Sequence, residues 1–131
     1  MPISSCRFFK RIAEFVPRKQ REGIPDNTRG IYALLKESGS DFDVVYIGCS
    51  AGTKAGIWAR MKSHDETKVR WTHFSIFEVH DNISREEIRE LEALFLHIYR
   101  KDGRANGLNR QLRHGRFGKI TEDDLSKWVA L

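Results

Sequence analysis

Residues 30–48 have the sequence GIYALLKESGSDFDVVYIG. Two runs rich in apolar and β-branched side chains, Arg29–Leu35 and Asp43–Cys49, lie on either side of a polar stretch at Lys36–Asp41 that contains Gly39. Such runs favour strands, and small polar residues with a glycine favour the turn that joins them. The stretch therefore predicts an antiparallel hairpin.

Helices and one further strand are predicted around this hairpin. In chain order, we expect a short helix over 4–15, loops over 20–28 and 50–56, a helix over 57–64, a strand over 70–79, a helix over 84–100 and a last helix from about Thr121. Ser84 and Glu87 have the spacing of a capping box, which favours a helix start at this point. This order predicts an α/β or α+β domain around a small sheet.

Length and composition exclude several classes of protein. The chain has 131 residues, 40% of them hydrophobic, which suits one globular domain. No apolar stretch approaches the roughly 18 residues of a membrane span, and the start lacks the apolar region of a signal peptide. Cys6 and Cys49 lie far apart without a CxxC spacing. We therefore expect a cytoplasmic protein in a reducing environment, not a disulfide scaffold or a zinc ribbon.

The basic charge is concentrated in two parts of the chain. There are 23 lysines and arginines against 18 acidic residues, a net charge of +5. One basic cluster lies between Arg7 and Arg21, and a second between Arg100 and Lys119. Such clusters suit an anionic partner such as a nucleic acid. The alternative is that they form a solvated face that keeps the protein soluble.

One carboxylate stands out by its position on a predicted helix. The apolar residues of the 84–100 helix form one arc: Ile88, Leu91, Phe95, Ile98 and Tyr99. At about 100° per residue, Glu92 falls inside this arc. A carboxylate on a core-facing side is costly unless a cation, a metal or hydrogen-bond donors meet it. The alternative is that Glu92 lies at the edge of the arc and pairs with an arginine.

Two further pairs of residues have side chains that could take part in catalysis. Arg60 and His64 are four residues apart on the 57–64 helix and share one side of it, where they offer a forked cation and a proton-transfer group. Tyr32 and Tyr46 lie in the two arms of the hairpin. Taken singly, these residues also fit a surface arginine, a half-buried histidine and two tyrosines that simply favour strands.

Taken together, these residues resemble a known family. GIY at 30–32 and YIG at 46–48, followed in order by Arg60 and His64, by Glu92 and by Asn109, are similar to the GIY-YIG nuclease domain. The resemblance covers residues 28–112. Outside it, we expect 1–27 to be a basic helical segment and linker, and 113–131 to be a basic loop and C-terminal helix on the same domain. The resemblance implies a three-stranded antiparallel sheet flanked by helices.

The resemblance also implies an activity, the hydrolysis of DNA phosphodiester bonds with one divalent cation. Glu92 would bind the metal, and a hard oxygen ligand suits Mg²⁺ or Mn²⁺. Arg60 would hold the scissile phosphate. Tyr32 would lie beside the attacking water, and Tyr46 would hydrogen-bond nearby. Three possibilities stay open for the proton transfer: Tyr32 as general base, His64 as general base, or direct activation of the water by the metal.

The remaining expectations concern Asn109 and the nucleic acid. Both Asn106 and Asn109 follow the 84–100 helix, and we prefer Asn109 because an apolar residue precedes it, as in the family. The residues expected to contact phosphates are Lys54, Arg100, Lys101, Arg104, Arg110, Arg113 and Arg116. The domain would recognise a DNA structure by itself, form a homodimer, or take its specificity from a partner protein. The rival hypothesis is a nucleic-acid-binding module that does not cleave.

Overall fold

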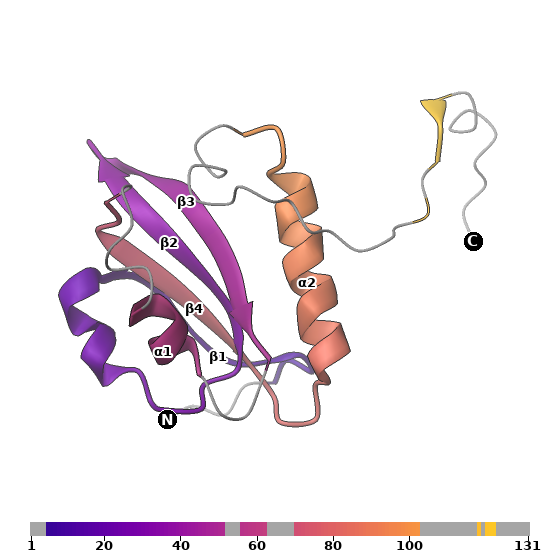
Figure 1. Ribbon diagram of the computed structural model, residues 1–131, viewed down its shortest axis with the longest axis horizontal. Helices are drawn as coiled ribbons and strands as arrows, with labels where there is room; N and C mark the ends of the chain where they lie inside the picture. Colours follow the sequence, from indigo (N-terminus) through magenta and orange to yellow (C-terminus); the bar gives the residue numbers. More distant parts are fainter. Residues whose placement is uncertain (1–4, 52–55, 63–69, 103–117, 119, 123–131) are drawn as a thin grey trace.

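An antiparallel sheet with helices on both faces forms the body of the protein (Figure 1). The computed structural model describes residues 5–51, 56–62, 70–102, 118 and 120–122. The elements in these residues are β1 (Phe9–Pro17), the 3₁₀ helix η1 (Arg18–Gly23), β2 (Gly30–Ser38), β3 (Asp41–Ser50), α1 (Ile57–Lys62), β4 (His73–Val79) and α2 (Arg85–Ile98). The four strands have the spatial order β1-β4-β2-β3. The predicted α+β class is thereby confirmed.

The predicted hairpin forms as expected. β2 and β3 pair antiparallel from Gly30 opposite Ser50 to Ser38 opposite Asp41. Gly39 lies in the turn with a φ of 62°, a left-handed backbone conformation that glycine adopts without steric cost. The third predicted strand, β4, pairs antiparallel with the other side of β2. β3 is therefore an edge strand of this sheet.

The N-terminal segment is not the predicted helix. Residues 9–17 form β1, which pairs antiparallel with β4, so the sheet has four strands where three were expected. Two apolar side chains of this segment, Ile12 and Phe15, are 53% and 51% exposed. Pairing with β4 satisfies backbone groups along a whole strand edge, and this long-range gain outweighs local helix preference. η1 also occupies part of the stretch that was predicted to be a loop.

The two faces of the sheet carry separate apolar cores. α2 covers one face, where Ile88 and Leu96 pack with Ile31 and Ile47 of the hairpin. α1 packs against the other face through two fully buried residues, Ile57 and Met61. Tyr32, Leu34, Val45, Trp71, Phe74 and Ile76 complete that second core. Because both helices contact β2 and β3, the hairpin lies between them.

The start of α2 agrees with its sequence signal. The Glu87 N–H donates to Ser84 Oγ at 3.1 Å, and the Ser84 N–H donates to the Glu87 carboxylate at 2.9 Å, which completes the predicted capping box. Ile98, which the periodicity assigned to the buried arc, is 62% exposed. Of the helix expected over 57–64, the last two residues lie outside the described part, as does nearly all of the C-terminal helix. In the part that is described, no helix has the length and apolarity needed to cross a membrane.

Candidate active site

Tyr32 and Tyr46 lie on the same face of the hairpin because Tyr32 lies opposite Gly48, and Tyr46 is two residues from Gly48 on the same strand. The β2–β3 register shifts between Leu34 and Leu35, which leaves Val45 without a partner on β2. Val45 and Tyr46 consequently both pack on the α1 side, with Tyr32. The two tyrosine rings lie 5.9 Å apart between centroids, tilted by 34°. The bulge therefore turns Val45 to the face that carries the tyrosines.

The two glycines of the hairpin ends are explained by close packing. Gly48 lies opposite Tyr32, and a Cβ at Gly48 would be 2.8 Å from Tyr32 Oη and 2.6 Å from Tyr46 Cε1. A Cβ at Gly30 would be 2.1 Å from the carbonyl oxygen of Phe77 on β4. Neither position has room for a side chain. These glycines therefore allow the tyrosine pair and the β2–β4 contact.

The tyrosine hydroxyls are hydrogen-bonded to each other and are hard to ionise. Tyr32 is only 1% exposed, and burial is the main cause that raises its pKa, with the neighbouring Tyr46 hydroxyl adding to the rise. Burial also raises the pKa of Tyr46, which is half-buried. Both side chains are accordingly neutral at pH 7. In the protein alone, they act as hydrogen-bond donors and acceptors, not as bases.

Glu92 comes to the site from α2 and meets two donors of β3. Its half-buried carboxylate accepts hydrogen bonds from the Cys49 thiol and from the Cys49 backbone N–H. Burial raises the pKa of Glu92, while these hydrogen bonds and the charges of Arg60 and Arg89 oppose the rise. Burial and the nearby Glu92 charge raise the pKa of Cys49 to about 12. The donors and cations that the helix periodicity requires around Glu92 are thus present.

Arg60 brings a positive charge to the same place. Burial raises the pKa of the two tyrosines, Cys49 and Glu92, and the charge of Arg60 opposes that rise at each of them. Its side chain is exposed on α1. The start of α1 is held by the Ile57 N–H, which donates to the Thr28 carbonyl at 3.0 Å. The site is thus an exposed guanidinium beside a half-buried carboxylate and two hydroxyls.

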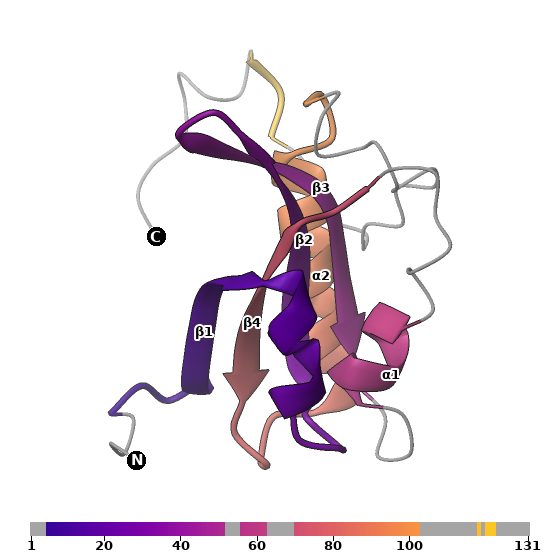
Figure 2. The same cartoon turned by 90° about the vertical axis from the view of Figure 1, so that its left-hand side faces the viewer.

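Four of the predicted site residues therefore come together from four different elements. Tyr32, Tyr46, Arg60 and Glu92 belong to β2, β3, α1 and α2, and they meet at the edge strand β3, which has α1 and α2 on opposite faces of the sheet (Figure 2). Electrostatic attraction to Arg60 and two neutral hydroxyls suit an anionic ligand. The arrangement fits a phosphate group next to a carboxylate.

Of the other predicted site residues, the structure describes Arg100 and Lys101. Arg100 and Lys101 are exposed just after α2, and the Arg100 guanidinium donates to the His97 carbonyl at 2.9 Å. The following predicted residues lie outside the described part of the chain: Lys54, His64, Arg104, Asn106, Asn109, Arg110, Arg113 and Arg116.

Sequence reasoning missed two residues of this cluster, Cys49 and Arg89. Cys49 directly follows the YIG triplet, and Arg89 is one helical turn before Glu92 on α2. The i,i+3 spacing of Arg89 and Glu92 was a usable signal. Nothing in the neighbouring sequence indicates that Cys49 lies beside Glu92, because Cys49 belongs to β3 and Glu92 to α2.

The donor set of the site fits a hard divalent cation held by few protein ligands. Glu92 supplies carboxylate oxygens, while Tyr32 and Tyr46 supply neutral oxygens nearby. Within the described ranges, no three His, Cys, Asp or Glu side chains gather as a ready metal cage. Mg²⁺ commonly takes one or two carboxylates and completes its shell with water and substrate phosphates. Glu92 therefore suits such an ion.

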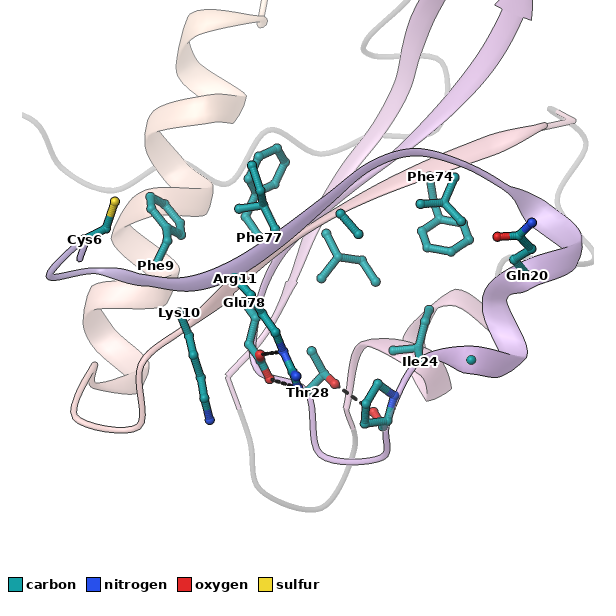
Figure 3. A pocket seen from close by; sticks show the side chains of 16 residues that line it. Cys6, Phe9, Lys10, Arg11, Gln20, Ile24, Thr28, Phe74, Phe77 and Glu78 are labelled. Atoms are coloured by element: carbon teal, nitrogen blue, oxygen red, sulfur yellow. Dashed lines mark hydrogen bonds and ion pairs between the residues drawn. The ribbon is translucent and has the colours of Figure 1, made fainter. Parts of the chain in front are cut away.

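A cavity of about 900 Å³ lies elsewhere, against β1 and β4 (Figure 3). Its lining is mostly apolar and includes Phe74, Phe77 and Ile24. The Arg11 guanidinium donates to the buried Glu78 carboxylate in its wall (Figure 3). The residues of the candidate site do not line this cavity. The two features are separate.

Comparison with known proteins adds no identification. No protein-family model, no curated protein and no solved structure matches the chain. The functional argument consequently depends on the residues and geometry of the site.

Proposed function

We propose that this protein is an endonuclease of the GIY-YIG type that hydrolyses DNA phosphodiester bonds with one Mg²⁺ or Mn²⁺ ion. The observation that carries the proposal is that Tyr32, Tyr46, Arg60 and Glu92 lie close enough at one edge of the sheet for the charges of Arg60 and Glu92 to act on both tyrosines. These residues are scattered along the chain, and the resemblance in the sequence implies each of them. A coincidental resemblance in two tripeptides would not require such a gathering.

Arg60 and Glu92 would divide the binding of the phosphate and the cation. The exposed Arg60 guanidinium suits two-point hydrogen bonding to a phosphate and stabilises charge that develops on it. Glu92 would hold the divalent cation through its carboxylate oxygens. When bound, such an ion withdraws electron density from the phosphate and lowers the pKa of water.

Tyr32 and Tyr46 would orient the attacking water. Burial raises the pKa of Tyr32, so its hydroxyl keeps its proton at pH 7. An orienting role needs only a fixed hydroxyl, and the hydrogen bond with Tyr46 supplies that fixation. Among the three routes for proton transfer, this favours those that do not require a tyrosinate.

DNA binding would involve the basic surface after α2. Arg100 and Lys101 are exposed there, at the start of the basic cluster that continues to Lys119. Lysines and arginines bind phosphates without reading base sequence. Preference for a DNA structure, a homodimer or a partner protein would then supply specificity.

The decisive experiment is a cleavage assay on supercoiled plasmid and on branched and single-stranded oligonucleotides, with Mg²⁺, Mn²⁺ or EDTA. We expect metal-dependent nicking that disappears in Glu92→Gln and falls about 10²–10³-fold in Arg60→Ala. Glu90→Gln is the matched control, because Glu90 is exposed on the same helix.

Two results would contradict the proposal. Equal cleavage by the wild type and Glu92→Gln would show that the carboxylate has no part in the reaction or that a contaminant cuts. Binding of DNA in gel shifts, with no cleavage of any substrate, would favour the module that binds without cleaving.

A further inference from the structure

The cavity against β1 and β4 has a charged end and an apolar run. Three cross-strand pairs follow one another along it: Arg11–Glu78, Ala13–Ile76 and Val16–Phe74. All six residues line the cavity. The first pair is charged and the next two are apolar. The strand register therefore separates the two kinds of lining along the length of β1.

A bulge in β1 brings Val16 to the cavity. The register with β4 shifts between Ala13 and Val16, so that both residues line the same cavity although they are three apart in a strand. Within this bulge, Phe15 has a φ of 53°, which is uncommon for a residue other than glycine. Its N–H donates to Ser75 Oγ at 3.1 Å. The bulge extends the apolar lining, and the small, exposed side chain of Ala13 leaves the cavity open.

The charged end of the cavity is positive on balance. The charged residues of the lining are Lys10, Arg11 and Glu78. The Arg11 guanidinium pairs with the Glu78 carboxylate, with Nη2 donating to Oε2 at 3.5 Å, so these two charges offset each other. The Lys10 ammonium lies 4.0 Å from Asp81, whose side chain is 93% exposed, and such a contact neutralises it little. An anionic group is thus favoured at this end.

The size and the lining of the cavity suit one class of ligand. Its volume of about 900 Å³ lies within the range of about 300–1,000 Å³ that is usual for ligand sites, which are mostly apolar with a few polar groups. In Figure 3, Lys10 lies beside Arg11, whereas Phe74 lies farther along the cavity. We propose that this cavity binds a long-chain carboxylate, with its head group at Lys10 and its alkyl chain along the two apolar pairs. This inference does not depend on the proposed function, because the candidate active site lies elsewhere.

The head group is tested by isothermal titration calorimetry with decanoate, decanol and decyltrimethylammonium, which share one alkyl chain. We expect decanoate to bind about 10-fold more tightly than the other two, because it alone gains a charge-assisted hydrogen bond. Lys10→Gln should remove most of this difference. Lys36→Gln is the matched control, because Lys36 is exposed on β2 and does not line the cavity. Equal affinity for the three head groups would overturn the proposal.

The location is tested by methyl NMR of the wild type during titration with decanoate. The signals of Ala13, Val16 and Ile76 should shift, whereas those of Ile31 and Ile47, in the core on the other face of the sheet, should not. Shifts of equal size on both faces would overturn the proposal.

A variant that fills the cavity gives a second test of the location. Ala13→Trp should abolish binding of decanoate, because Ala13 is exposed within the lining and a large side chain there occupies the ligand's space. Urea unfolding checks that this variant keeps its fold. Binding as in the wild type would place the ligand outside the cavity and overturn the proposal.

A second copy of the chain is the rival occupant of the cavity. Sedimentation of the wild type over a range of concentrations, without decanoate, separates the two. We expect a constant mass and unchanged methyl signals. A mass that rises with concentration, together with shifts of the Ala13 and Val16 signals, would overturn the proposal in favour of a dimer that forms at this cavity.

Discussion

The side chain of Tyr32 lies against Gly48, its cross-strand neighbour, so closely that any Cβ there would be 2.8 Å from Tyr32 Oη. The ring of Tyr46 approaches the same point from the bulged part of β3, 2.6 Å from that Cβ position. The absence of a side chain at Gly48 thus permits both tyrosines to share one face of the hairpin. The glycine of the YIG triplet is thus explained by the space that the two tyrosine rings occupy.

Gly48→Ala should force the two rings apart. We expect the free energy of unfolding to fall by about 1–3 kcal/mol, the usual cost of inserting a methyl group into a filled site. The tyrosine hydrogen bond should weaken too, so cleavage should fall along with stability. Urea unfolding measures the first effect. Gly23→Ala is the control, because no atom lies within 4 Å of its Cβ position, and a wild-type-like Gly48→Ala would contradict this account.

The hydroxyls of Tyr32 and Tyr46 should prove energetically coupled. Tyr32→Phe and Tyr46→Phe each remove the hydrogen bond they share, and each should cost about 1 kcal/mol. The double variant should cost clearly less than the sum, because the bond can be lost only once. Urea unfolding of the wild type, the two single variants and the double variant measures this coupling in a double-mutant cycle. Strict additivity would mean that the two hydroxyls act independently.

Without metal, the Glu92 carboxylate should destabilise the fold at neutral pH. Burial raises its folded-state pKa above the ordinary value of 4.5, so between these two values the native state binds more protons than the unfolded state. The free energy of unfolding contributed by Glu92 therefore falls as pH rises through that window and stays low above it. Glu92→Gln should be more stable than the wild type at pH 7, with the difference vanishing below about pH 4.

Thermal unfolding across pH in EDTA measures this effect, and a Glu92→Gln protein less stable than the wild type at pH 7 would contradict it. Added Mg²⁺ offers a companion measurement tied to the proposed function. At ten times its Kd, the ion should stabilise the wild type by about 1.4 kcal/mol and leave Glu92→Gln unchanged.

Away from the site, Arg11 should stabilise the attachment of β1. Its guanidinium pairs with Glu78 of β4, which is 8% exposed. Arg11→Ala would leave this buried carboxylate without that partner, so we expect a loss of about 1–3 kcal/mol in urea unfolding. Lys10→Ala is the control. Lys10 and Asp81 lie 4.0 Å apart with highly exposed side chains, so its loss should change stability by less than about 0.5 kcal/mol. Equal effects of the two substitutions would refute the assignment.

The candidate site was predictable in part, because some of its residues carry local signals. Glu92 interrupts an apolar helical arc, and the structure places it half-buried with donors around it. Tyr32 and Tyr46 belong to triplets that meet in the hairpin where Tyr32 pairs with Gly48. Cys49 carries no such signal, because its partner belongs to a helix that is distant in the chain.

Local chemistry by itself determined the hairpin and α2. The turn around Gly39, the β-branched runs beside it and the capping box of Ser84 and Glu87 involve neighbours in sequence, so their patterns are visible in the residues alone. Only the tertiary structure decided that residues 9–17 form a strand, since β4 supplies the backbone hydrogen-bond partners for this segment. It also decided the bulge at Val45 and the contact of Cys49 with Glu92. These features arise where distant backbone groups and side chains must satisfy one another once the chain has folded.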